Sequence, residues 1–231
     1  MSLVALGFSV WSFWVNHQEA GVKDVRSKKE ELRKLLVDLI ALQSDFASNV
    51  SQIKDNAQRI SASTFLNAKR VIYLDTAEQL TDELAGHVSA SEYIALAMEK
   101  VSQSDFKKAE TYFIRATGVA RDDVQKATAW RNLGAYYLTT PAFRELVKGR
   151  EVFGKAVNST INGDDDGSKY TTGYTYETWG WCELQNNNFA EAQAKFTSAK
   201  EFYGKMNPAN PVGRWSLDAL NTKLAASQLS Q

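Results

Sequence analysis

One short stretch, residues 130–137, has the residue spacing of a single, closely packed helix face. Four of its residues stand at positions i, i+3, i+4 and i+7, which lie on the same side of an α-helix; they are Trp130, Leu133, Gly134 and Tyr137. The small Gly134 lets a neighbouring helix come close, while the large side chains fill the space beside it. This stretch therefore predicts a helix whose apolar face packs closely against a neighbouring helix.

Looser forms of the same arrangement stand on either side of this stretch. In each one, a helix with two large residues and a small one precedes a helix with a small–aromatic–alanine pattern. The residues are Tyr93, Leu96 and Ala97 with Ala109, Phe113 and Ala116, then Gly149, Phe153 and Ala156 after the central stretch, and finally Tyr176, Trp179 and Gly180 with Ala192, Phe196 and Ala199. We therefore expect three helical hairpins, at about 90–123, 127–162 and 173–206, with a polar insertion, Asn162–Thr172, before the third.

Polar residues mark where these helices begin. Ser89 and Glu92 have the spacing of a capping box. Asn210 followed by Pro211 is typical of an N-cap and the first residue of a helix, and this last helix fits the terminal cap that a solenoid needs. The second helices of the three hairpins are expected to begin after Ser104, Thr140 and Asn188.

This pattern resembles the tetratricopeptide repeat (TPR), whose first helix carries large and small residues in this order and whose second helix carries alanine, an aromatic residue and alanine. The strict form occurs once, at Trp130–Tyr137, and the resemblance covers roughly residues 90–230. One departure is Gly149, which stands where alanine is usual. The resemblance implies an all-α, TPR-like helical-hairpin solenoid that binds a partner along a concave groove.

In TPR arrays, the groove is lined by inward-facing side chains from the first helix of each repeat. By register, these are Ile94, Met98, Thr128, Arg131, Ala135, Leu138, Tyr174, Glu177 and Trp181. A mixed apolar surface with one arginine and one glutamate suits an amphipathic helix or an extended peptide. TPR proteins that recognise chaperone C-termini bind them with lysine and asparagine side chains. Ile94 and Met98 stand where the first of these polar residues would be, so we do not expect that function here. In the alternative, the N-terminal helices of the chain fill the groove.

A stripe with coiled-coil spacing precedes the repeats, in the region 17–88. Its residues alternate in steps of three and four; they are Val22, Val25, Lys29, Leu32, Leu36, Leu39, Gln43, Phe46, Val50, Ile53, Ala57 and Ile60. As one helix, residues 22–60 would extend about 58 Å and could join chains into a homo-oligomer. In the alternative, the stripe packs against the next helix, Thr64–Leu84, with Phe65 and Ile72 on its inner face.

The first 16 residues are uncharged and mostly apolar. A membrane-spanning helix needs about 20 such residues, so we interpret residues 1–16 as an anchor that could be the end of a longer span. Lysines and arginines follow this segment and none precedes it, which predicts a cytoplasmic location for the soluble part. The alternatives are a buried or partner-bound apolar helix and a periplasmic location.

Composition and motifs favour neither nucleic-acid binding nor catalysis. The chain has 27 basic and 27 acidic residues, whereas nucleic-acid-binding domains usually have a basic excess. It has no CxxC, no HExxH and no glycine-rich phosphate loop. We therefore expect no enzyme activity, no cofactor and no metal. Cys182 is interpreted as a packed thiol, and the acidic run 164–166 as an exposed turn.

Together, these features predict a membrane-anchored, non-enzymatic TPR adaptor that binds a protein or peptide partner. The first alternative is a structural subunit of a larger membrane complex, with an apolar N-terminus that packs against that complex. The second alternative is a periplasmic envelope-assembly factor that combines a coiled coil with TPR repeats.

Overall fold

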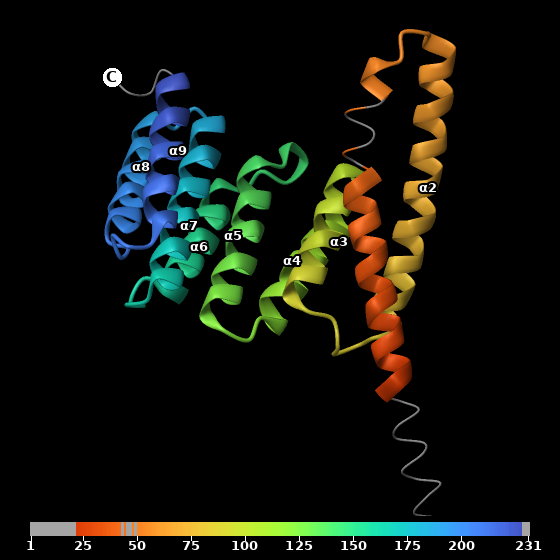
Figure 1. Ribbon diagram of the computed structural model, residues 1–231, viewed down its shortest axis with the longest axis horizontal. Helices are drawn as coiled ribbons and strands as arrows, with labels where there is room; N and C mark the ends of the chain where they lie inside the picture. Colours follow the sequence, from red (N-terminus) through yellow and green to blue (C-terminus); the bar gives the residue numbers. More distant parts are fainter. Residues whose placement is uncertain (1–21, 43, 45–47, 49, 228–231) are drawn as a thin grey trace, which may run out of the picture. The chain divides into compact units, whose positions relative to one another are not determined.

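The computed structural model describes residues 22–42, 44, 48 and 50–227, and every regular element in this part of the chain is helical. The fold is all-α and solenoid-like, as the sequence predicts (Figure 1). The chain divides after Val88 into two compact units, and we describe each by itself. The proposed anchor, residues 1–16, lies outside the described residues. No helix among the described residues is both long and apolar enough to span a membrane.

The first unit contains two antiparallel helices, which lie side by side in Figure 1. One spans residues 22–42, and the other, α2, spans Asn56–Glu83. The start of the first helix is joined to the end of α2, because Lys28 Nζ lies 3.1 Å from Glu83 Oε2. This is the hairpin that we considered as the alternative to a stalk. The fully or nearly buried leucines of the first helix are Leu32, Leu36, Leu39 and Leu42.

The single helix predicted to continue to Ile60 does not form, so that prediction is wrong. A short 3₁₀ helix, η1 (Val50–Gln52), precedes a break, and α2 begins at Asn56. The physical reason is a helix cap at the break. The Asp55 carboxylate accepts a hydrogen bond from the Gln58 backbone N–H at 2.8 Å, and such a bond stabilises a new helix N-terminus.

The inner face of α2 also differs from the prediction. Phe65 and Ile72 were expected to be buried, but they are 68% and 63% exposed. Only the second half of α2 is buried, and its buried residues are Leu74, Ala77, Leu80 and Thr81. The first half of α2 therefore presents apolar side chains at the surface of the described chain.

The second unit is an array of helical hairpins (Figure 1). Its elements are α3 (Ala90–Ser102), α4 (Phe106–Val119), α5 (Asp123–Thr139), η2 (Pro141–Phe143), α6 (Leu146–Thr160), α7 (Asp166–Gln185), α8 (Phe189–Gly204) and α9 (Pro211–Ala226). Helix α3 pairs with α4, α5 with α6 and α7 with α8, and α5 also contacts α3 and α7. The first helices of successive hairpins are therefore neighbours, as in a solenoid.

Glycines on the first helices allow the close approach that the sequence predicts. A Cβ atom at Gly134 would lie 2.8 Å from Cδ2 of Phe153, and a Cβ atom at Gly180 would lie 2.6 Å from Cε1 of Phe196. Both phenylalanines are buried. The predicted role of Gly134 is thus confirmed, because any larger residue would push the two helices of the hairpin apart.

The second hairpin has an irregular turn. Thr140 and Pro141 were expected to start its second helix, but they lead only into the 3₁₀ helix η2, and α6 begins at Leu146. Gly149 then packs where a Cβ atom would lie 2.7 Å from Cδ2 of Leu138. The departure from the usual alanine at Gly149 therefore has a steric cause in this hairpin.

The helix ends bear out some of the predicted caps and correct others. The Ser89–Glu92 capping box is present, and the Asn210 side chain caps α9. Ser104 is not the cap of α4: it has a φ of 63°, and Asp105 accepts the bond from the first turn. Asn188 precedes α8, but its side chain makes no capping bond.

The polar insertion predicted at Asn162–Thr172 is also wrong, because α7 begins at Asp166 and is helical through most of that range. Asp165 provides the cap, since its carboxylate accepts hydrogen bonds from the backbone N–H and the hydroxyl of Ser168 at 2.9 and 2.6 Å. This earlier start lengthens the first helix of the third hairpin by more than one turn and adds Tyr170 to it.

Candidate partner-binding surface

The predicted groove residues do not all reach the surface. Leu138 is completely buried in a cluster with Phe153 and Cys182, so it packs the core of the array and lines no groove. Glu177 is only 5% exposed. Its carboxylate accepts hydrogen bonds from the Tyr203 hydroxyl at 2.8 Å and from Lys223 Nζ at 2.9 Å.

The other predicted residues keep some exposure on the three first helices. Met98 and Tyr174 are exposed, at 56% and 40%. Trp181 is half-buried and packs edge-on against Phe196, with the ring centroids 4.8 Å apart, so much of it belongs to the core. The remaining half-buried residues are Ile94, Thr128, Arg131 and Ala135.

Arg131 and Tyr174 form the central contact of this surface and join α5 to α7. The guanidinium carbon of Arg131 lies 4.5 Å from the centroid of the Tyr174 ring, within the range of a cation–π interaction. Tyr174 in turn stacks on Tyr170, with the centroids 6.0 Å apart and the rings 10° from parallel. Burial lowers the pKa of Arg131, and the three tyrosines around it, at positions 170, 174 and 203, oppose that shift. An arginine remains charged at neutral pH in any such environment.

Tyr170 is a member of this cluster that our sequence analysis missed. It lies in the range we interpreted as a polar insertion, whereas the structure places it in the second turn of α7. Two local signals were available. Asp165 with Ser168 has the spacing of an N-cap and its donor, and Tyr170 stands four residues before Tyr174, which places both on one helix face.

The hydrogen bonds that Tyr203 and Lys223 donate to Glu177 have a structural role. Burial and the neighbouring Glu177 carboxylate raise the pKa of Tyr203 well above its ordinary value. The phenol therefore keeps its proton and donates a hydrogen bond to the Glu177 carboxylate. Because Lys223 belongs to α9 and Tyr203 to α8, this network joins the capping helix to α7.

The acidic run 164–166 and Cys182, which could have indicated metal binding or a reactive thiol, have structural roles. Asp166 accepts hydrogen bonds from the Asn207 backbone N–H and from Asn210 Nδ2, both at 2.9 Å, which tie the start of α7 to the α8–α9 loop. Cys182 is buried, and burial raises the pKa of its thiol to about 12, so it is the packed thiol that we predicted. Within the described residues, no three His, Cys, Asp or Glu side chains converge as metal ligands.

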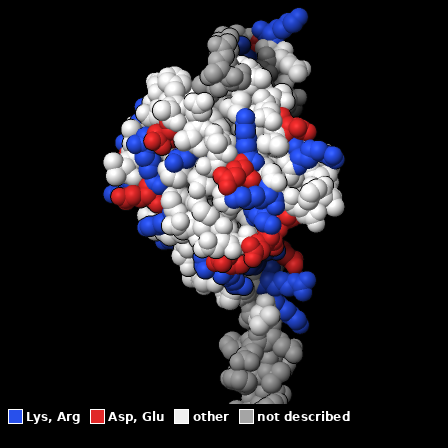
Figure 2. All heavy atoms as spheres, turned by 90° about the vertical axis from the view of Figure 1, so that its left-hand side faces the viewer, with Lys and Arg blue, Asp and Glu red and all other residues white. Residues whose placement is uncertain are grey.

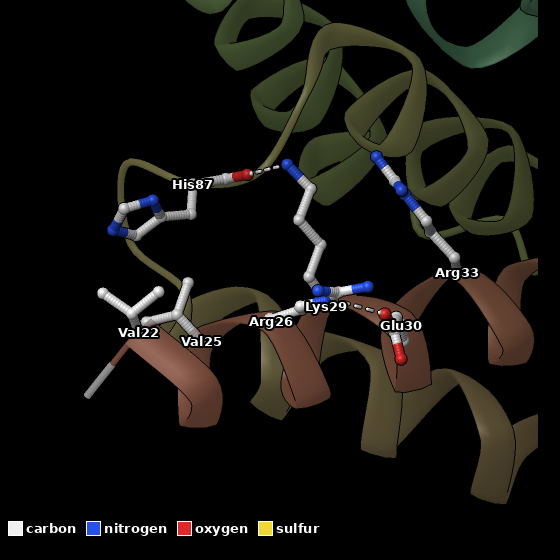
Figure 3. A pocket seen from close by; sticks show the side chains of 7 residues that line it. All are labelled: Val22, Val25, Arg26, Lys29, Glu30, Arg33 and His87. Carbon is white, nitrogen blue, oxygen red and sulfur yellow. Dashed lines mark hydrogen bonds and ion pairs between the residues drawn. The ribbon is translucent and has the colours of Figure 1, made fainter. Parts of the chain in front are cut away.

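A separate hollow of about 870 Å³ lies in the first unit, between the helix at 22–42 and the loop after α2. Figure 3 shows its mixed lining, in which apolar residues, Val22 and Val25, accompany charged ones. Lys29 Nζ donates a hydrogen bond to the His87 carbonyl at 2.8 Å, and Arg26 pairs with Glu30 at 3.1 Å. Lys29 interrupts the apolar stripe for a visible reason: it fastens the loop after α2 to the first helix.

Charges on the array are mixed in sign. On the face shown in Figure 2, basic and acidic residues alternate and are separated by broad uncharged areas. Such a surface lacks the continuous basic stripe that a nucleic-acid-binding face carries.

The fold defines a class of protein: an all-α, solenoid-like array of helical hairpins whose successive first helices are neighbours. Comparison with known proteins adds no family to this description. No family model matches the chain, and a search of curated proteins finds no match either.

Proposed function

We propose that the array is a non-enzymatic, TPR-like scaffold that binds a protein partner along the surface of α3, α5 and α7. The observation that carries this proposal is the surface itself. Met98 and Tyr174 are large and exposed, and Arg131 lies between them in sequence on the middle helix. Exposed aromatic and arginine side chains on a rigid framework are typical of binding surfaces.

The assignment to a TPR-like scaffold rests on the repeated small-to-aromatic contact. Gly134 with Phe153 and Gly180 with Phe196 make this contact in two successive hairpins, and the residue types match the pattern of the TPR. The membrane anchor at residues 1–16 and the cytoplasmic location of the array rest on the sequence alone, and they complete the proposed adaptor.

The test is affinity capture of the whole chain from its native host in mild detergent. We compare the wild-type protein with Arg131→Glu and with a matched control, Arg144→Glu, which makes the same charge change on an exposed residue of the η2–α6 loop. The adaptor proposal expects one specific protein to be lost with Arg131→Glu and kept with Arg144→Glu. Circular dichroism must show that both variants remain helical.

If all three proteins capture the same complex at a fixed ratio, the surface of the first helices is not the binding site. That result would favour the alternative, a structural subunit of a larger membrane complex. The exposed apolar residues of α2 support this second candidate, because Phe65 and Ile72 are more than half exposed and contiguous exposed apolar surface marks interaction sites. A double substitution, Phe65→Ser with Ile72→Ser, should then release the complex.

The same substitution tests homo-oligomerisation through the first unit. Sedimentation velocity of the wild-type chain would show a concentration-dependent oligomer, and the double variant would shift it to monomer. The periplasmic alternative is tested separately by a reporter at the C-terminus, since activity restricted to the cytoplasm would eliminate it.

A further inference from the structure

Arg131 is a half-buried cation of the array for which no described residue is an anionic partner. The contact of its guanidinium is with the ring of Tyr174, and no hydrogen bond or ion pair joins it to a described residue. Three other cations of the array each contact a carboxylate of another helix; the pairs are Arg150 with Glu183 at 2.7 Å, Lys148 with Glu110 at 3.1 Å and Lys223 with Glu177 at 2.9 Å.

The contact with Tyr174 leaves the binding capacity of Arg131 unused. A guanidinium carries five N–H donors in a rigid fork, and a cation–π contact engages its charge without taking up any of these donors. Tyr174 is itself stacked on Tyr170, so the support beneath the guanidinium is rigid. A charged group held in this way loses little side-chain entropy when it binds a ligand.

The acidic group that contacts this cluster, the Glu177 carboxylate, already has two partners. Glu177 lies on the same helix as Tyr174, but its two carboxylate oxygens accept bonds from Lys223 and Tyr203. Rotating Glu177 toward Arg131 would leave both of those donors unpaired, one of them buried, which is costly. A partner for Arg131 that comes from another molecule would leave these bonds in place.

We propose that Arg131 binds a carboxylate of the partner, supplied by an aspartate or glutamate next to an apolar residue in an acidic segment. This proposal rests on the protein-binding function proposed above and names the chemistry of the partner. A carboxylate matches the fork of an arginine with two parallel hydrogen bonds. The site has one uncompensated cation, which balances one carboxylate but not a doubly charged phosphate. The exposed Met98 on the neighbouring first helix provides the apolar contact.

The experiment selects short random peptides from a display library on the whole wild-type chain, held in mild detergent. Parallel selections use Arg131→Gln and the matched control Arg144→Gln. We expect peptides from the wild-type and Arg144→Gln selections to share an aspartate or glutamate beside an apolar residue, and peptides from the Arg131→Gln selection to lack it.

One selected peptide is then measured by fluorescence anisotropy, beside the same peptide with its acidic residue changed to the corresponding amide. Loss of a charge-assisted, bidentate contact should weaken binding about ten- to a hundredfold. The same loss should appear with Arg131→Gln. The affinity of Arg131→Lys should lie between those of the wild type and Arg131→Gln, because lysine keeps the charge but not the forked geometry. Tyr174→Phe should bind as the wild type does, since it keeps the ring.

The outcomes separate this proposal from the one on which it rests. Peptides that bind the wild type through Met98 but carry no acidic residue, or that tolerate both the amide and Arg131→Gln, overturn the carboxylate proposal and leave the binding surface standing. If the wild-type chain selects no peptide, or if every selected peptide is indifferent to substitutions on α3, α5 and α7, both proposals are wrong.

Discussion

The two units of this chain use their large apolar side chains in different ways. In the array, the rings of Phe153 and Phe196 are buried against glycines of the facing helix. In the first unit, Phe65 and Ile72 are seven residues apart and so lie on one face of α2, yet Phe65 is 68% exposed. An aromatic side chain thus stabilises the fold in one unit and remains available for another contact in the other.

The difference shows that helical spacing alone does not determine burial. A stripe of large residues becomes a core only where another element packs closely against it. In the array, Gly134 and Gly180 let the facing helix come close to each ring, whereas the buried residues of α2 all lie in its second half. The predictions below compare the two units, beginning with the largest expected effect.

Removing an aromatic ring should affect the two units very differently. Phe153→Ala leaves a cavity in the array and should lower the free energy of unfolding by about 3–5 kcal/mol. Phe65→Ala removes an exposed ring and should change it by no more than about 0.5 kcal/mol. Urea denaturation followed by circular dichroism measures both. Equal losses in the two variants would mean that α2 is packed more fully than its exposure indicates.

Glu183 should make the array sensitive to acid. Its side chain is fully buried. Burial would raise the pKa of Glu183, but hydrogen bonds from Arg150, Trp179 and Asn188 outweigh that effect and lower it below the ordinary value of 4.5. Because the pKa is lower in the folded state, the stabilisation is complete above about pH 4.5 and is lost as the pH falls through the folded-state value.

Glu183→Gln should therefore cost about 1.5–3 kcal/mol at neutral pH, and the cost should shrink in acid. Denaturation curves of both proteins between about pH 7 and about pH 3, a range that includes the titration of a carboxylate, measure this difference in the free energy of unfolding. A cost that stays constant across the range would show that the carboxylate charge does not contribute. Glu110→Gln, which removes another acidic partner of the array, serves as a comparison for the size of the effect.

Two glycine-to-alanine substitutions in the array should change the free energy of unfolding in opposite directions. Gly134→Ala places a Cβ atom 2.8 Å from Phe153, whose ring is held in a stack with Trp179 at 5.3 Å, so we expect a loss of about 1–3 kcal/mol from overpacking. Gly154 lies inside α6 with no atom near its added Cβ. Gly154→Ala should gain about 0.5–1 kcal/mol from reduced backbone entropy. Thermal unfolding distinguishes the two. A gain from Gly134→Ala would contradict the close-packing argument.

The smallest effect is expected in the first unit, at the ion pair between Lys28 and Glu83. The two side chains are 33% and 38% exposed, so their attraction is weakened by water and by salt. Glu83→Gln should shift the unfolding midpoint only slightly, and the shift should disappear at high salt. A salt-resistant loss as large as that of Glu183→Gln would show that this pair is more important to the hairpin than its exposure suggests.

Much of the array could be predicted because its signals are local. The capping box at Ser89 and Glu92 lies within one turn, and Asn210 with Pro211 marks the start of α9 by adjacent residues alone. The contact of Gly134 with a facing aromatic ring was predictable for a related reason: the two helices are consecutive, so the short connection leaves few ways to pair them.

The errors arose where two competing local signals were close in strength. The coiled-coil spacing favoured one helix through residues 43–60, but the cap at Asp55 started a new one. The run of polar residues from Asn162 favoured a loop, but the cap at Asp165 started α7 early. In both cases a single carboxylate accepted hydrogen bonds from a new helix N-terminus, and apolar spacing carries no information about such bonds.

The sequence by itself determined the helical class, the three hairpins and the small residues that let their helices meet, because these depend on contacts between neighbouring segments. Only the tertiary structure decided which side chains of the first helices remain available. Leu138 and Glu177 were predicted to line the same groove as Arg131. Leu138 is buried in the core instead, and Glu177 binds Lys223 of the capping helix α9. Arg131 has no ion pair or hydrogen bond with a described residue, and the Glu177 carboxylate binds Lys223 and Tyr203.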